Sequence, residues 1–355
     1  MACFTRAVFT IDSHTAGEPT RLVVGGLPCL RGATLAEKMI YARKELDGLR
    51  GLLMLEPRGR QDMYGALLTT PSNSEADFGL VFMNTQQYTT MCGHAVIGAA
   101  TVVIETGMVP AVEPETTVVF DTPVGLVHTQ ACIQDGRVLK VAFNSTPVFV
   151  YQLDVSLLDP DLGQVPADIV YSGGFFALIE AERVGLALTP ANARTLAELG
   201  SRLRHLANEQ LSVQHPELPF VTTIDAVEFH GPAECQADGT LCARNATTFG
   251  ECTIDRSPCG TGTCARMAVL HAKGELKVGQ PFVSESIITP KGGVLRGIHF
   301  VGRIVEETRV GEYRAIVPRV AGRAYLTGFH QFVLDLDDPF PHGFSLDQAR
   351  IKGDL

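Results

Sequence analysis

Two stretches of the 355-residue chain, Cys92-Gly93-His94-Ala95 and Cys259-Gly260-Thr261-Gly262, follow one pattern. In each stretch a cysteine and a glycine come after a strand-like segment and precede an apolar run that favours a helix. The helices are predicted over residues 95–106 and 263–273, and each run is followed by a glycine, which is common just past a helix C-terminus. This repetition predicts two pseudo-symmetric halves, each with one cysteine at the N-terminus of its helix.

The rest of the chain is predicted to consist mostly of strands. Short apolar runs between turn residues predict strands at residues 20–24, 51–55, 65–69, 79–83, 116–149, 222–229, 240–253 and 282–334. Apolar residues at every third or fourth position predict one or two amphipathic helices over residues 189–214. Strands and helices do not alternate at intervals of about 30 residues, so a Rossmann sheet is not expected.

We therefore expect an α+β (α/β) fold of two halves, each with mostly antiparallel strands around a helix. The first half comprises residues 1–150 plus about 335–355 and carries Cys92. The second half comprises residues 151–334 and carries Cys259. The segment from residue 335 onward is polar and rich in turn-forming residues.

Composition narrows the class of protein. The formal net charge is −10, from 29 Lys and Arg against 39 Asp and Glu, which argues against nucleic acid or an anionic membrane as partner. No run approaches the roughly 18 apolar residues of a membrane span. Residues 1–12 lack an apolar stretch typical of a signal peptide, so a cytoplasmic, reducing location is expected. The nine cysteines are odd in number and show no disulfide ladder, so free thiols are expected.

The two Cys-Gly turns are chemically distinctive. A helix N-terminus offers unpaired backbone N–H groups and the positive end of the helix dipole, which can lower a thiol pKa from ~8.5 to ~3.5–7.5. The glycine lets a ligand approach the backbone closely, and the N–H groups suit a carboxylate. Each turn is thus a candidate thiolate beside a carboxylate cradle. Two such turns facing one cleft would place an acid and a base on opposite faces of one substrate carbon.

The remaining cysteines and the glycines of the second turn have simpler interpretations. Free cysteines are usually buried structural residues, and we interpret the following so: Cys3, Cys29, Cys132, Cys235 and Cys242. Cys252 and Cys264 flank Cys259, but the spacing Cys-x6-Cys-x4-Cys is not the paired spacing of a zinc site, and no metal site is predicted. Gly260-Thr261-Gly262 lacks the Gly-Lys-Ser/Thr ending of a phosphate loop.

The residues around both turns resemble the signature segments of the proline racemase family. These segments are Met91-Cys92-Gly93-His94 and Asp255-Arg256-Ser257-Pro258-Cys259-Gly260-Thr261-Gly262-Thr263. The family also contains hydroxyproline 2-epimerases and trans-3-hydroxy-L-proline dehydratases. The likeness extends from residue 12 to about residue 344, through four further segments: Asp12-Ser13-His14-Thr15-Ala16-Gly17-Glu18-Pro19-Thr20-Arg21, Glu56-Pro57-Arg58-Gly59, Asp62-Met63-Tyr64-Gly65-Ala66 and Gly173-Gly174-Phe175-Phe176.

This resemblance implies a fold like that of diaminopimelate epimerase, with the active site in the cleft between two halves. It also implies a homodimer, a small-molecule substrate and no cofactor. In the family's racemases one cysteine, as a thiolate, removes the Cα proton, while the other, as a thiol, protonates the opposite face. By position, Cys92 and Cys259 would have these roles.

The resemblance further implies a set of substrate-binding residues. Backbone amides after each cysteine would hold the carboxylate, at Gly93, His94, Gly260 and Thr261. Asp255 would contact the ring nitrogen, and aromatic residues would surround the ring, at Tyr64, Phe82 and Phe249. Taken alone, His94 is equally well a helix-cap donor, Asp255 a turn residue or partner of Arg256, and each aromatic residue part of the core.

The reaction within the family is left open between alternatives. The dehydratases usually have Thr in place of the second cysteine, so Cys259 favours racemisation of proline or epimerisation of a hydroxyproline at C2. Tyr64 differs both from the Phe of proline racemases and from the 4-hydroxyproline epimerases, which tend to lack an aromatic residue there. A trans-3-hydroxy-L-proline dehydratase is the first alternative, and a non-catalytic imino-acid-binding protein is the second.

Overall fold

The computed structural model describes residues 4–219, 221–290 and 298–346, and the chain divides into two compact units. The first unit comprises residues 1–139 and 324–355, and the second comprises residues 140–323. The sequence-based expectation placed these boundaries near residues 150 and 334. Parts of two predicted segments, residues 291–297 and 347–355, lie outside the described residues, as does Cys3.

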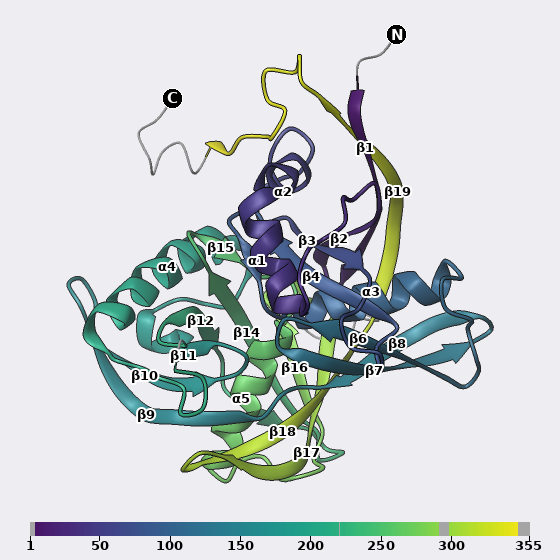
Figure 1. The fold of residues 1–355 in the computed structure, drawn as a ribbon. Coiled ribbons are helices and arrows are strands. Elements are labelled where there is room, and N and C mark those ends of the chain that lie inside the picture. Colours follow the sequence, from purple (N-terminus) through teal and green to yellow (C-terminus); the bar gives the residue numbers. More distant parts are fainter. Residues whose placement is uncertain (1–3, 220, 291–297, 347–355) are drawn as a thin grey trace. The chain divides into compact units, whose positions relative to one another are not determined.

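The first unit is built on one mixed sheet. Its strands are β1 (Phe4–Thr15), β2 (Glu18–Gly25), β3 (Tyr64–Thr69), β4 (Phe78–Asn84), β6 (Glu115–Thr122), β7 (Gly125–Gln134) and β19 (Ala324–Asp335). They pair in the order β19-β1-β2-β3-β4-β6-β7, and the short β5 (Tyr88–Thr89) pairs with β4. The pairs β2–β3 and β4–β6 are parallel. Figure 1 shows β1 and β19 side by side as two long strands.

Three helices belong to this unit. The helices α1 (Leu35–Glu45) and α2 (Asp47–Met54) connect β2 to β3, and α3 (Gly93–Glu105) leads from β5 to β6. Helix α3 packs against β1, β2 and β19 and is buried from Gly93 to Ile104, because nearly all of its side chains are small or apolar. It ends at Glu105 with Thr106 as the C-cap, followed by Gly107 at a φ of 75°, and the sequence predicts a glycine just past this end.

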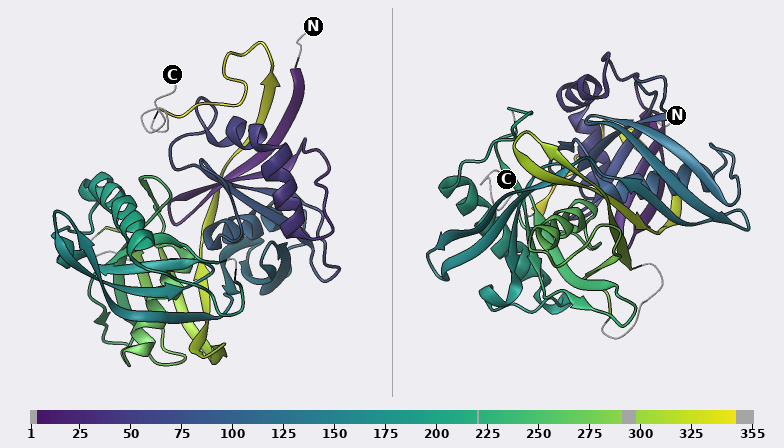
Figure 2. Two further views of the ribbon diagram at one scale, coloured as in Figure 1. Left: turned by 60° about the vertical axis from the view of Figure 1, so that its left-hand side comes forward. Right: turned by 90° about the horizontal axis from the view of Figure 1, so that it is seen from below.

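The second unit is a closed ring of strands around a helix. The ring consists of β9 (Val148–Asp159), β10 (Gly163–Tyr171), β11 (Phe175–Glu180), β12 (Ile224–His230), β14 (Leu241–Phe249), β16 (Phe282–Ser286), β17 (His299–Val310) and β18 (Tyr313–Gly322). Each strand pairs with the next, and β18 pairs back with β9. Helix α5 (Gly260–Ala272) packs against β9, β10, β11, β17 and β18, and Figure 2 shows the strands surrounding it.

Shorter elements complete this unit. Helix α4 (Ala193–Gln210) packs against β9, β12 and β14, after two 3-10 turns, η1 (Ala181–Val184) and η2 (Pro190–Asn192). The short strands β13 (Glu234–Cys235) and β15 (Thr253–Ile254) pair with β14. Strand β8 (Arg137–Asn144) pairs with β18 through residues 141–144. The apolar core lies between the strands and α4, around Phe149, Phe175 and Phe229.

Both units repeat one strand topology. The series β1-β2-β3-β4-β6-β7 and β10-β11-β12-β14-β16-β17 pair in the same order and with the same parallel and antiparallel directions. Helices α3 and α5 stand at the same step. Helix α3 follows β5, which pairs with β4, and precedes β6, which is parallel to β4. Helix α5 follows β15, which pairs with β14, and precedes β16, which is parallel to β14. This repeat is the topological counterpart of the two Cys-Gly turns.

Some sequence predictions are wrong. The strand predicted over residues 51–55 is the end of helix α2, where Leu49, Leu52 and Leu53 are buried at the i, i+3, i+4 spacing of a helix face. The sequence analysis also omits helix α1, whose N-cap Thr34 accepts a hydrogen bond from the Glu37 amide. Its buried side is narrow, with only three buried residues, so its apolar periodicity is weak.

Most of the predicted elements are confirmed with small shifts in their ends. The helix predicted within residues 189–214 is α4, and the helix predicted over 263–273 is α5, which starts at Gly260. Strands β1, β10 and β11 and the four parallel pairings were not predicted.

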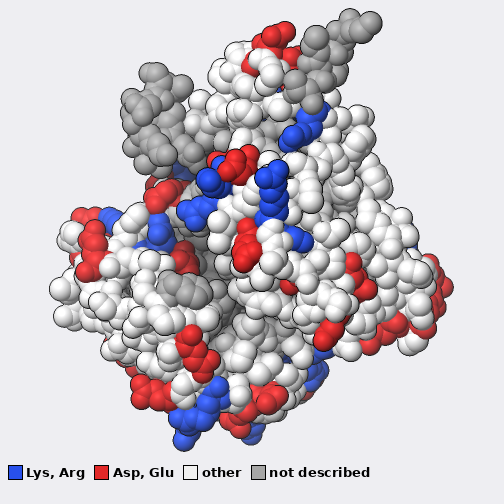
Figure 3. All heavy atoms as spheres, viewed as in Figure 1, with Lys and Arg blue, Asp and Glu red and all other residues white. Residues whose placement is uncertain are grey.

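On the face in Figure 3, acidic and basic side chains are intermixed. In the described part of the chain, no helix has the length and hydropathy needed to cross a membrane.

Candidate active site

Cys92 occupies the N-cap of α3 in the first unit. Its backbone is extended, with φ −154° and ψ 112°, and the first helical hydrogen bond runs from the Val96 amide to the Cys92 carbonyl. The amides of Gly93 and His94 therefore precede the helical ladder, where N–H groups have no intrahelical acceptor. The thiol of this buried cysteine lies at the positive end of the helix dipole, beside backbone donors that suit an anion.

The His94 ring is the immediate neighbour of this thiol. The distance from Cys92 Sγ to His94 Nδ1 is 3.1 Å. Burial lowers the pKa of His94 to about 3, although a hydrogen bond with the Pro19 backbone acts in the opposite direction. His94 is therefore neutral at pH 7, and Nδ1 can accept the thiol proton or donate to a thiolate, depending on the tautomer.

The predicted aromatic residues of this unit take different positions. The Tyr64 ring meets the His94 ring edge-on, with centroids 4.8 Å apart, and its hydroxyl lies 2.6 Å from Thr89 Oγ1. Phe82 is fully buried on β4 and pairs with Thr89 of β5. Tyr64, His94 and Cys92 thus form one contiguous group, in which the Tyr64 hydroxyl already has a protein partner.

Cys259 occupies the equivalent N-cap of α5 in the second unit. Its backbone has φ 58° and ψ 118°, a left-handed φ that is strained for a non-glycine residue. The Gly262 amide donates to Cys259 Sγ at 3.4 Å, and Thr261 Oγ1 lies 3.5 Å from the same sulfur. Such strain is common at functional sites, and here it directs the side chain back onto its own helix N-terminus.

Asp255 lies beside Cys259 on the approach to this turn. Its Oδ1 accepts the Ser257 amide at 2.7 Å, and the Cys259 thiol donates to its carboxylate. Burial raises the pKa of Asp255 above its usual range, while the Ser257 and Cys259 hydrogen bonds oppose that shift. Burial, followed by the negative charge of Asp255, raises the pKa of the Cys259 thiol well above its usual value. The second cysteine is therefore held as a thiol, although it stands at a helix N-terminus.

Two other predicted features of the second unit can be placed. Ser172 Oγ donates to the Thr261 carbonyl at 2.8 Å, which brings the turn before Gly173-Gly174 against the Cys259 turn. Phe249 ends strand β14, half-buried, and pairs with Thr253 of β15. The second unit thus gathers Cys259, Asp255 and Thr261 into one group.

A buried carboxyl group that the sequence analysis missed lies under this turn. Glu228, on β12, is completely buried, and its Oε2 accepts from Thr247 Oγ1 at 3.4 Å. Burial raises its pKa to about 7, against an opposing effect of Arg266. No local motif marks Glu228, because it reaches the turn through the pairing of β12 with β14.

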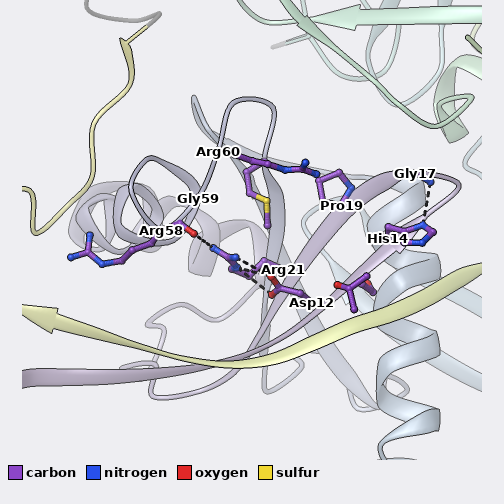
Figure 4. Close-up of a pocket in the computed structure, with 11 residues that line it drawn as sticks. Asp12, His14, Gly17, Pro19, Arg21, Arg58, Gly59 and Arg60 are labelled. Carbon is purple, nitrogen blue, oxygen red and sulfur yellow. Dashed lines mark hydrogen bonds and ion pairs between the residues drawn. The ribbon is translucent and has the colours of Figure 1, made fainter. Parts of the chain in front are cut away.

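A pocket of about 380 Å³ opens in the first unit (Figure 4). It is lined by residues of segments quoted for the family resemblance, including His14, Pro19, Arg21 and Arg58, and by Arg60 between two of those segments. Its buried cation is already neutralised, since Arg21 forms a bidentate pair with Asp12, at 2.9 Å for the closest contact, and donates to the Arg58 carbonyl. Arg58 in turn pairs with Asp338. The pocket is therefore largely charge-compensated.

Neither a disulfide nor a metal centre is found in the described residues. The eight cysteines among them are all free thiols. In the same residues, no group of three or more His, Cys, Asp and Glu side chains is arranged to hold a metal ion.

Comparisons with known proteins agree on one family. The family model described as Proline racemase matches residues 10–345. The proline racemase of Clostridioides difficile is 47% identical over 344 residues, covering 97% of this chain and 99% of that protein. A 4-hydroxyproline 2-epimerase of Streptosporangium roseum is 42% identical over 343 residues, covering 96% of this chain and 99% of that protein.

The solved structures add a likeness in three dimensions. A hydroxyproline epimerase from Agrobacterium vitis, solved with bound trans-4-hydroxy-L-proline, is 34% identical and superposes with a TM-score of 0.86. The alignment covers 98% of this chain and 97% of that one. The mixed fold of strands and helices described above is therefore the fold of this structure as well.

Proposed function

Because the chain belongs to the proline racemase family and is an isomerase of the racemase and epimerase type, we propose that it inverts Cα of proline or a hydroxyproline with two cysteines and without a cofactor. The observation that carries this proposal is the paired placement of Cys92 and Cys259. Each stands at the N-cap of the helix at the same step of a repeated topology. We further propose that the two turns face one substrate across the cleft between the halves.

Inversion by two thiols requires one base and one acid. One cysteine, as a thiolate, takes the Cα proton, and the other, as a thiol, delivers a proton to the opposite face. The reverse reaction exchanges these roles, so both groups must serve as acid and as base. The geometry supports unequal starting roles: Cys92 lies beside a neutral histidine nitrogen, whereas the Cys259 thiol donates to Asp255. We therefore assign Cys92 as the base and Cys259 as the acid in the resting enzyme.

The Cα proton of an amino acid is a very weak acid, so the developing negative charge needs oriented donors. The amides of Gly93 and His94, and those of Gly260 and Thr261, precede the first helical hydrogen bonds and are suited to a carboxylate. Asp255 would pair with the cationic ring nitrogen, which keeps the Cα proton acidic. Binding of that cation would also favour the charged form of Asp255, whose pKa burial raises in the free protein.

The ring itself would rest against Tyr64 and Phe249, while Phe82, which is fully buried, would contribute from behind them. The Tyr64 hydroxyl is engaged by Thr89, so the tyrosine would present its ring rather than a free hydroxyl to the substrate. This arrangement supports proline at least as well as a hydroxyproline. We also propose a homodimer, which light scattering on the purified protein would test.

A substrate panel tests the reaction. L-proline, D-proline, trans-4-hydroxy-L-proline and trans-3-hydroxy-L-proline would each be incubated with the enzyme and followed by chiral chromatography and NMR in D2O. Inversion with deuterium incorporated at Cα is the expected result for proline or a 4-hydroxyproline. A cyclic imine from trans-3-hydroxy-L-proline, without inversion of any substrate, would identify a dehydratase. Binding without exchange at Cα would identify an imino-acid-binding protein.

The two-thiol mechanism makes a direct prediction for variants. Cys92→Ser and Cys259→Ser should each lower kcat for inversion by about 10²–10⁴-fold, because a hydroxyl is a far weaker acid and base catalyst than a thiol at this step. Cys29→Ser, at an exposed free cysteine, is the matched control and should retain activity. Polarimetry at saturating substrate measures the loss. Full activity in both active-site variants would exclude the mechanism.

A further inference from the structure

We propose that Glu228 is a positioning residue whose charge acts together with burial and Asp255 to hold Cys259 in its thiol form, so that the two cysteines begin the reaction in different protonation states. The inference rests on the proposed role of Cys259 as the acid, but its test does not depend on catalysis. It concerns a buried acid that takes no part in the steps described above.

The first support is the position of the carboxyl group. Glu228 lies directly under the first turn of α5, where a Cβ added to Gly262 would overlap Glu228 Oε2 and would come within 2.8 Å of Thr247 Oγ1. The same built Cβ would lie 3.2 Å from Cys259 Cβ. The Glu228 carboxyl group and the Cys259 side chain therefore lie against the same side of Gly262, and the amide of that residue donates to the sulfur.

The second support is that Glu228 is poorly compensated. The carboxyl group is completely buried, and the hydrogen bonds it receives come from neutral side chains, from Thr247 Oγ1 to Oε2 at 3.4 Å and from Asn245. Arg266 on α5 is the cation that acts on Glu228, but no ion pair within 4.0 Å joins them in the described structure. An uncompensated carboxylate in a dry site acts strongly on its neighbours.

The charged groups around the pair have opposite effects. Burial raises the pKa of Cys259 most, Asp255 on the approach to the turn and, to a smaller extent, Glu228 on β12 raise it further, and Thr261 and the Gly262 amide lower it. The pKa of Cys264 on α5 is raised by burial and, to a smaller extent, by Glu228. Arg266 lowers the pKa of Glu228 and so favours the charged form of that carboxyl group. The thiol of Cys259 is thus influenced by two acids, and the charge of either one opposes formation of its thiolate.

The pKa of Glu228 near 7 makes this influence dependent on pH. Below pH 7 the carboxyl group is protonated and exerts little effect on the thiol. Above pH 7 it is charged and opposes formation of the Cys259 thiolate. The structure therefore favours a Cys259 that stays protonated under neutral and alkaline conditions, when Cys92 is free to ionise.

Alkylation of the free enzyme by iodoacetamide tests the proposal. The rate at Cys259 would be followed from pH 6 to pH 9 by peptide mass spectrometry, in the wild type and in Glu228→Gln, with Cys29 as an exposed reference in the same samples. We expect equal rates at Cys259 at pH 6, and a rate about tenfold higher in the variant at pH 9, since one buried charge is gone. Glu285→Gln is the matched control, because Glu285 pairs with Arg244 and raises the pKa of Cys242 rather than of Cys259.

The outcomes separate the possibilities. Identical pH profiles of the Cys259 alkylation rate in wild type and Glu228→Gln would overturn the proposal. A rate in the variant that is raised by the same factor at pH 6 and at pH 9 would show structural loosening and would also overturn it. If the variant fails to fold, the wild-type profile still decides: ionisation of Glu228 predicts a plateau in the Cys259 rate near pH 7, and an unbroken rise contradicts it. Failure of the proposed catalysis would appear only in the Cys→Ser variants, leaving this profile unchanged.

Discussion

At the scale of single residues, burial decides the charge of the groups near both cysteines. His94 has its pKa lowered to about 3 and Glu228 has its pKa raised to about 7, because a dry site penalises the charged form of each. Both groups are therefore able to be neutral near physiological pH. A neutral histidine beside one thiol and a titratable acid beside the other make the two halves electrically unequal.

The raised pKa of Glu228 has a consequence for stability. Its pKa is 4.5 in the unfolded chain and about 7 in the folded chain, so the folded state binds more protons between these values. The free energy of unfolding contributed by Glu228 is therefore fully present below pH 4.5. It falls by about 3 kcal/mol as the pH rises to about 7. Glu228→Gln should remove this loss.

Urea unfolding of wild type and Glu228→Gln at pH 5 and pH 8 measures the effect. The variant should gain up to about 3 kcal/mol relative to wild type between the two pH values. Parallel stability curves for the two proteins would show that Glu228 does not titrate in this range.

At the scale of elements, the start of α5 depends on a glycine for space rather than for a positive φ. Gly262→Ala would push a methyl group against Glu228 and Thr247 and displace the first turn of the helix. We expect a loss of about 1–3 kcal/mol in the free energy of unfolding and about 100-fold in kcat, because the Cys259 thiol and the adjacent amides would shift together.

Gly107→Ala provides the comparison at the other cysteine helix. Gly107 follows α3 at a φ of 75° and a Cβ there would meet nothing within 4 Å. Its cost is conformational, about 1–2 kcal/mol, and inversion should be unaffected. Urea unfolding and polarimetry on both variants distinguish the two effects; equal activity losses would contradict the role given to Gly262.

At the scale of the whole molecule, the proposed two-thiol reaction requires one substrate to engage both units. Binding of one small carboxylate by two helix N-termini should stabilise both, since a ligand that binds only the folded state adds to the stability of every segment it holds. Hydrogen exchange with saturating L-proline should therefore show slower exchange at residues 91–96 and at residues 259–264.

Peptides around Cys29, away from both helix starts in the sequence, serve as the internal control in that experiment. Slower exchange at only one of the two turns would contradict the shared site and would favour simple binding by one unit. Repeating the measurement with trans-4-hydroxy-L-proline would rank the two substrates by the protection that each confers.

The sequence by itself determined the two cysteine turns, the helices that follow them and the family. These features are local: a Cys-Gly pair, an apolar run and a terminal glycine lie within about fifteen residues, so helix propensity and capping suffice to predict them. The same local approach assigned residues 51–55 to a strand, because a short apolar run in a buried helix has the composition of a strand.

Only the tertiary structure decided what surrounds each thiol. Glu228 reaches the Cys259 turn because β12 pairs with β14 and the start of α5 lies against both at Gly262. Tyr64 reaches His94 because β3 lies beside the start of α3. Such neighbours come from strand register and packing between distant segments, which no local pattern encodes. Burial, and with it the charge of His94 and Glu228, follows from those long-range contacts and not from the residue type.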